Sequence, residues 1–355
     1  MKTVADLTKR LSELHQQTRE TPLFNPVFQL SLDLSRKLEA KEIDLGDIEN
    51  MIAELECGSL KNRATRLRRN LAPVSPTEND GALATLRTDD FDAFCTQWES
   101  PGMHAVFTAH PTFLLTPEQT DAVASAASQD GAISDDTCVA NFARPDISLR
   151  YEHDRAMGAI ANAQDARDRI VANALGGAAE AFPTKWYAAK PLPFRFASWV
   201  GYDMDGRTDI KWFDSIGFRL SEKAQRLERY VASLEAIDEA HPLLETLRNA
   251  LGYSQDRAAE FREDLSEPEA LSKAANTLTE DHPYKMLSLA PVIELLEAEA
   301  VGVETERAIG LKTLAAAMRA DGLGMGWIHF RVNSSQLHNA IRRRIDPDNT
   351  LDLGS

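Results

Sequence analysis

His110 is the residue whose sequence neighbours best suit it to acid–base chemistry. It lies in residues 106–112, which read VFTAHPT. The β-branched and aromatic residues of this run favour a strand, and Pro111 keeps His110 extended and prevents a helix from passing through it. The carboxyl end of a strand is where barrels and open α/β sheets bind ligands, and a neutral imidazole can take or give a proton near neutral pH. His110 is therefore a candidate general base, with a packed or surface loop histidine as the alternative.

A second group of polar residues follows another apolar run. Residues 198–207 read SWVGYDMDGR, so Asp203 and Asp205 stand two positions apart beside Gly206. Two carboxylates at this spacing are candidate metal ligands. Asp-x-Asp-Gly is also ordinary turn chemistry, and no acidic residue follows at the place where a calcium loop needs one. We therefore expect a turn here and assign no metal ligand.

Helical periodicity dominates the segments that must position these groups. Apolar residues recur every three or four positions over residues 4–14, 27–38 and 45–71, and prolines then interrupt the pattern at Pro73 and Pro76. Residues 1–75 are therefore predicted to form a helical layer.

Three apolar runs, near residues 104–109, 194–200 and 327–332, are typical of strands, and long helical segments separate them. This pattern predicts a predominantly helical α/β fold with a parallel sheet, for which a doubly wound sheet and a barrel are the main candidates. Three strands cannot close a barrel, so residues 76–355 would form an incomplete α/β barrel segment. Arg195 opens the second run, and alternation along that strand points its side chain either into a barrel mouth or to the surface.

The overall charge of the chain restricts its partners. The 355 residues include 39 basic and 55 acidic side chains, a net charge of −16, and 43% of the residues are hydrophobic. Such a composition is ordinary for a globular protein of one large or two smaller domains. The negative field argues against nucleic-acid and anionic-membrane partners, but it leaves room for an anionic substrate held by local arginines.

Cysteine content and targeting signals indicate a compartment. Cys57, Cys95 and Cys138 are widely spaced, odd in number and without zinc-like spacing. The first ten residues lack the apolar core of a signal peptide, and no run approaches the ~18 apolar residues of a membrane span. We expect reduced thiols in a soluble cytoplasmic protein.

Three motifs resemble those of phosphoenolpyruvate carboxylases, in the same order along the chain. Residues 108–112 match the family's TAHPT signature, and residues 198–207 are similar to its SWxGGDRDGNP loop. Residues 328–335 read IHFRVNSS, in which Arg331 and Ser334 fall on the Arg and Ser of the family's Arg-Gln-Glu-Ser strand. The family is mostly helical, is built around an α/β barrel and is more than twice this length. The resemblance therefore implies the N-terminal part of such an enzyme.

The resemblance also implies an activity and a set of roles. Members of the family carboxylate phosphoenolpyruvate with bicarbonate to give oxaloacetate and phosphate, a carbon–carbon lyase reaction of carbon dioxide fixation that supplies the tricarboxylic acid cycle and uses Mg²⁺. Such chemistry needs cations to hold phosphate and a base to take a proton. The resemblance implies that His110 is the base, that Arg331 binds substrate, and that Asp203, Asp205 and Gly206 belong to an active-site loop. Arg195, from its place in the strand, and Arg207, which could restore a guanidinium to the loop, are further candidate substrate-binding residues. The family's metal ligands lie in its later half, and the full-length protein is expected to be a homo-oligomer.

Departures from the family motifs support an alternative. The Glu and paired arginines that follow the histidine motif in the family are absent, because residues 113–117 read FLLTP. Tyr202 and Met204 replace a glycine and an arginine of the second motif, although Arg207 could restore a guanidinium nearby. The alternative is a complete, degenerate and non-catalytic relative that binds a phosphorylated metabolite or a protein partner.

Overall fold

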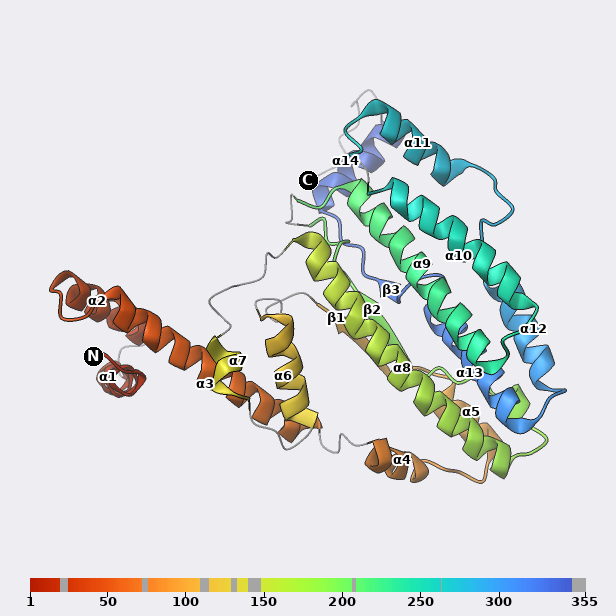
Figure 1. Cartoon of the computed structure of the whole chain (residues 1–355), viewed down its shortest axis with the longest axis horizontal. Helices are drawn as coiled ribbons and strands as arrows, with labels where there is room; N and C mark the ends of the chain where they lie inside the picture. The colour runs from red at the N-terminus through yellow and green to blue at the C-terminus, as the bar shows by residue number, and fades with distance from the viewer. Residues whose placement is uncertain are drawn as a thin grey trace. The chain divides into compact units, whose positions relative to one another are not determined.

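The computed structural model describes residues 1–19, 25–71, 76–108, 115–128, 133–139, 148–205, 209–262 and 264–346. This part of the chain is mostly helical and contains a three-stranded parallel sheet (Figure 1). The prediction of a predominantly helical α/β fold is confirmed at this level. The described strands form an open sheet and do not close into a barrel.

The chain divides into two compact units. The first comprises Met1–Asn79 and Thr112–Asp146, and the second comprises Asp80–Pro111 and Ile147–Ser355. The predicted boundary near residue 75 falls beside residues 72–75, which lie outside the described residues.

The first unit is helical. Its helices are α1 (Val4–Gln17), α2 (Pro26–Glu39), α3 (Leu45–Leu71), α6 (Pro117–Ser128) and α7 (Asp135–Val139). Local sequence explains where two of them begin: the Thr3 side chain and Asp6 form a capping box at α1, and Asn25 caps α2 ahead of Pro26. Leu60 and Val123 belong to a small core that joins α3 to α6.

Cys57 on α3 and Cys138 on α7 form a disulfide in the first unit. The expectation of reduced thiols is therefore wrong for this pair. The two residues are 81 positions apart, and they meet only because α7 packs on α3, which their spacing in the sequence does not reveal. Cys95 is a free thiol, and burial, together with the nearby Glu99, raises its pKa to about 11.

The second unit carries the sheet. Its elements, with α4 joining the two units in sequence, are α4 (Pro76–Ala84), α5 (Phe91–Trp98), β1 (Met103–Phe107), α8 (Leu149–Ala181), a 3₁₀ turn (Trp186–Ala188), β2 (Phe194–Ser198), α9 (Trp212–Ile237), α10 (Leu243–Glu260), α11 (Pro268–Thr279), α12 (Ala290–Ala300), α13 (Thr305–Asp321), β3 (Trp327–Ile328) and α14 (Ser334–Ile345).

The strands run parallel in the order β1-β2-β3. Met103 pairs with Phe194 and Phe107 with Ser198, while Ala197 pairs with Trp327. The second and third strands are shorter than the predicted runs of residues 194–200 and 327–332. Beyond β3, a single bridge between Asp203 and Arg331 continues the pairing.

Helices contact one face of this sheet. Helix α8 contacts β1 and β2 and crosses in front of them in Figure 1, and α13 also contacts β2. Phe196 points to this face, where its ring lies 5.7 Å from the Arg167 guanidinium of α8. Alternation therefore directs Arg195 and its register partner His104 to the opposite face. The main core, which includes Leu175, Leu227 and Leu311, lies among the helices.

Within the described residues, we find no helix whose length and apolar character would let it cross a bilayer.

Candidate functional site

The loop after β2 turns sharply at the carboxyl edge of the sheet. The Ser198 hydroxyl donates to the Phe107 carbonyl (2.9 Å), and the same oxygen accepts from the Val200 N–H (3.1 Å), so the loop is anchored to β1. Gly201 follows with φ +87°, and a Cβ at this position would lie 2.7 Å from the Phe218 ring. Only glycine fits both the backbone conformation and this close approach. The turn fixes the direction in which residues 202–205 leave the sheet.

Asp203 and Arg331 meet at this edge. Their side chains form an ion pair of 3.1 Å, and the Arg331 backbone pairs with the loop by accepting from the Met204 N–H (2.9 Å) and donating to the Tyr202 carbonyl (3.1 Å). The Arg331 guanidinium also lies 5.7 Å from the centre of the Trp199 ring and 4.0 Å from Asp205. The structure thus brings together the second and third motifs of the sequence, with the arginine of one neutralising an aspartate of the other.

Asp203 does not fit the role of a Mg²⁺ ligand. One carboxylate oxygen accepts from the Asp205 N–H (3.3 Å), which is the expected turn, and the other pairs with Arg331. Mg²⁺ needs oxygen ligands that are free to enter an octahedral shell. Among the described residues, the one group of three candidate ligands is Cys57, Asp135 and Cys138, and its two sulfurs are joined in the disulfide. No described residue is therefore assigned to a metal.

Arg195 lies on the sheet face opposite Phe196, half-buried and 4.9 Å from the centre of the Trp327 ring. His104 and His329 lie on the same face, with 3.3 Å between their Nε2 atoms and only 5° between their ring planes. This distance and orientation suit a hydrogen bond from one imidazole to the other. Sequence reasoning missed His104, although alternation along β1 and β2 would have placed it beside Arg195.

Three of the predicted site residues, His110, Gly206 and Arg207, lie outside the described residues. His110 follows the last residue of β1, Phe107, by three positions in the sequence.

A buried polar network lies beneath the loop. Glu222 of α9 is at its centre: one carboxylate oxygen accepts from the Tyr202 hydroxyl (2.5 Å) and lies 3.0 Å from His153 Nε2, and the other accepts from Arg219 (3.0 Å). His153 of α8 stacks on Phe218, with ring centres 4.1 Å apart. Tyr202, His153 and Glu222 are all buried. The network connects α8 and α9 to Tyr202, the residue that stands in place of the second glycine of the family motif.

Hydrogen bonding decides the ionisation of this network. Burial alone would raise the pKa of Glu222, but its bonds to His153, Tyr202 and Arg219 outweigh burial and lower it. Burial alone would lower the pKa of His153, but its bonds to Asp154 and Glu222 outweigh burial and raise it. Burial and the Glu222 carboxylate raise the pKa of Tyr202, which stays a neutral donor. Glu222 is thus the shared acceptor for one imidazole, one phenol and one guanidinium.

The opposite pKa shifts predict that the His153–Glu222 network stabilises the second unit most in mildly acidic solution. The raised pKa of His153 gives stability that is complete below its ordinary value of about 6.5 and is lost as the pH rises through the folded-state pKa. The lowered pKa of Glu222 gives stability that is complete above its ordinary value of about 4.5 and is lost as the pH falls through the folded-state pKa. The maximum contribution therefore lies between about pH 4.5 and 6.5.

Urea unfolding followed by tryptophan fluorescence tests this, because all five tryptophans belong to the second unit. His153→Gln is expected to reduce the decline in unfolding free energy above pH 6.5, by the part that this imidazole contributes. His338→Gln, which changes an exposed histidine of α14, serves as the control and should keep it. Equal pH slopes for the wild type and His153→Gln would contradict the assignment.

The sequence pattern pointed to one member of this network and gave no indication of the others. Tyr202 stood out as a departure from the family motif, whereas His153 and Glu222 lie 69 positions apart on two helices and carry no local signature.

Comparison with models of known protein families gives no match, and comparison with curated proteins gives none either. Function therefore rests on the residues and their geometry.

Proposed function

We propose that this chain is part of a phosphoenolpyruvate carboxylase-like enzyme, which forms oxaloacetate and phosphate from phosphoenolpyruvate and bicarbonate. One observation carries the proposal: the three motifs of the resemblance are each attached to one of three consecutive parallel strands of a single sheet. Carboxyl ends of parallel strands meet at one edge, so residues following β1 and β2 and those of β3 can serve a common site there.

The proposed roles are divided between one base and several cations. His110 takes the proton released from the carboxyl intermediate, and Arg195 and Arg207 hold anionic groups of the substrates. Arg331 is half exposed, and a substrate phosphate could compete with Asp203 for its guanidinium. Mg²⁺, which the resemblance implies, has no ligand set among the described residues, so these roles concern anion binding and the proton alone.

The distribution of side chains over the two sheet faces supports the barrel part of the proposal. In an α/β barrel, helices cover the outer face of each strand and the inner face carries the enclosed side chains. Here α8 packs on the face of Phe196, while Arg195, His104 and Trp327 lie on the other. Further strands beside β1 or β3 would enclose these residues, as the family fold requires. Cytoplasmic location and homo-oligomer formation belong to the same proposal.

A second candidate is a non-catalytic relative that binds a phosphorylated metabolite or a protein partner. The ion pair between Arg331 and Asp203 favours it, because it occupies the arginine of the third motif. The burial of Tyr202 favours it as well, because the phenol is committed to Glu222.

An assay of the intact protein separates the two candidates. We expect phosphoenolpyruvate, bicarbonate and Mg²⁺ to yield oxaloacetate, measured as NADH oxidation by added malate dehydrogenase, with no signal when bicarbonate is omitted. Binding of radiolabelled phosphoenolpyruvate without turnover would reject the carboxylase and support the non-catalytic relative. Absence of both turnover and binding would reject the carboxylase and would exclude phosphoenolpyruvate as the ligand of the non-catalytic relative.

A further inference from the structure

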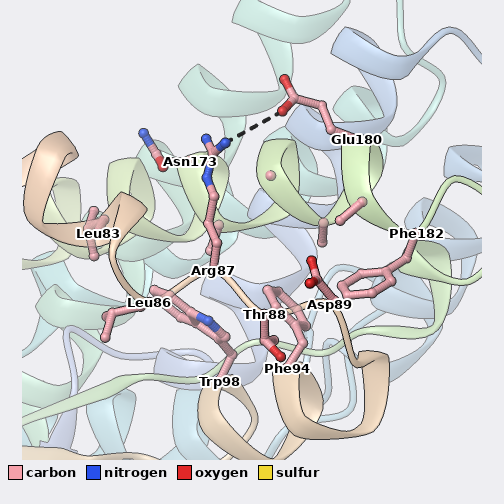
Figure 2. A pocket seen from close by; sticks show the side chains of 14 residues that line it. Leu83, Leu86, Arg87, Thr88, Asp89, Phe94, Trp98, Asn173, Glu180 and Phe182 are labelled. Atoms are coloured by element: carbon pink, nitrogen blue, oxygen red, sulfur yellow. Dashed lines mark ion pairs between the residues drawn. The ribbon is translucent and has the colours of Figure 1, made fainter.

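A cavity of about 320 Å³ lies in the second unit, between the carboxyl-terminal half of α8 and the segment that joins α4 to α5 (Figure 2). This volume is within the range of small-molecule sites. The cavity is remote from the loop described above: His153 and Gly177 are about 24 positions apart on α8, which corresponds to about 36 Å of helix. The proposed carboxylase chemistry makes no use of it.

The inner wall of the cavity is apolar and aromatic. Phe94 and Trp98 are core residues of α5, with ring centres 6.1 Å apart, and Phe182 packs on Phe94 at 6.2 Å. On the α8 side the wall is made of small residues, Ala174, Gly177 and Ala178, which leave the space unfilled. The cavity can therefore take a ring or a branched aliphatic group, with aromatic side chains for contact.

The rim of the cavity carries charges of both signs. Arg87 crosses over Gly177, and its guanidinium points towards Glu180 with a separation of 3.7 Å (Figure 2). The two side chains are 62% and 77% exposed, so this ion pair is weak and a ligand carboxylate can replace it. Asp89 stands beside Phe182 on the same rim and has no ion-pair partner among the described residues. Its carboxylate is therefore available to a ligand cation.

We propose that this cavity binds a free α-amino acid with a large apolar side chain. The side chain enters between Trp98 and the small residues of α8, the carboxylate pairs with Arg87, and the ammonium group pairs with Asp89. A ligand with only a negative charge would be repelled by the carboxylates of Asp89 and Glu180. A hydrocarbon without charges would form no ion pair with Arg87 or Asp89. Only a ligand with both charges and an apolar body is complementary to the whole cavity.

Titration calorimetry with three probes tests the charge requirement on the full chain. L-Phenylalanine is expected to bind with a Kd on the order of a millimolar or tighter, given its size. 3-Phenylpropionate lacks the ammonium group and 2-phenylethylamine lacks the carboxylate, and each should bind at least about tenfold more weakly, as for the loss of one charge-assisted hydrogen bond. Equal binding of the three probes, or no binding of L-phenylalanine, would overturn the proposal.

Substitutions in the cavity test which residue pairs with each charged group of the ligand. Arg87→Gln should weaken L-phenylalanine and leave 2-phenylethylamine unchanged, whereas Asp89→Asn should weaken L-phenylalanine and leave 3-phenylpropionate unchanged. Gly177→Leu fills the cavity and should abolish binding of all probes. Gly158→Leu is the matched control on the exposed side of the same helix, where an added Cβ meets nothing within 4 Å. Binding of L-phenylalanine that survives Gly177→Leu would place the ligand elsewhere.

Discussion

Replacing His110 by asparagine is expected to lower oxaloacetate formation by the intact protein by about 10² to 10⁴-fold, the usual contribution of a general base. Asparagine keeps a similar size and a hydrogen-bonding group but cannot accept a proton near neutral pH. The motif attaches His110 to the exit of β1, so the substitution should leave the strand pairing of β1 with β2 intact. Fold is checked by circular dichroism, and turnover by the malate dehydrogenase assay.

The control for this variant is His338→Asn, which alters an exposed histidine of α14 and should keep full turnover. Binding of phosphoenolpyruvate is also expected to survive His110→Asn, because arginines rather than the imidazole hold the phosphate in the proposed site. Turnover retained within a few-fold of the wild type would remove His110 from the role of base while leaving the fold assignment untouched.

The sheet could be predicted because its strands are apolar runs between long helical segments. The length of β3 could not be predicted from the sequence. Residues 327–332 are as strand-like as those of β2, but a strand needs a partner, and β2 turns away at Gly201. After Ile328, the pairing continues among the described residues only through the His329 N–H to Ser198 carbonyl bond (3.0 Å) and the bridge of Arg331 with Asp203. The end of β3 is thus set by a turn more than a hundred residues earlier in the chain.

The residue types of the candidate site could be predicted from the sequence, but the ion pairs and hydrogen bonds between these residues could not. The turn at Asp203 follows from local Asp-x-Asp-Gly chemistry, and the structure has it. The pairing of Asp203 with Arg331 depends on the register between loop and strand, which no local pattern encodes. Buried partners such as His153 and Glu222 are harder still, since helical periodicity marks apolar faces and says nothing of which charged residue is turned inward.

A second buried network holds the helices that support the sheet. Asp321, the last residue of α13, accepts two hydrogen bonds of 2.8 Å from Arg167 of α8 and forms an ion pair of 2.8 Å with Arg226 of α9. All three side chains are almost completely buried. Nearby, Gln164 accepts from Arg226 (3.0 Å) and donates to the Met325 carbonyl (2.9 Å), which lies on the turn into β3. Asp168 also accepts from Arg167 (2.9 and 2.8 Å), so Arg167 pairs with two carboxylates, whereas Arg226 pairs with Asp321.

Asp321→Asn is expected to lower the free energy of unfolding of the second unit by about 3 to 5 kcal/mol, because it removes the carboxylate that pairs with the buried Arg226 and one of the two that pair with the buried Arg167. Urea unfolding followed by tryptophan fluorescence measures the effect in this unit. The matched control is Glu235→Gln, which breaks an exposed ion pair with Arg248 and should cost less than about 1 kcal/mol. If Asp321→Asn cost no more than this control, the network would not be what holds α8, α9 and α13 together. A large loss would also be expected to disturb β3, because Gln164 joins the same network to the backbone just before that strand.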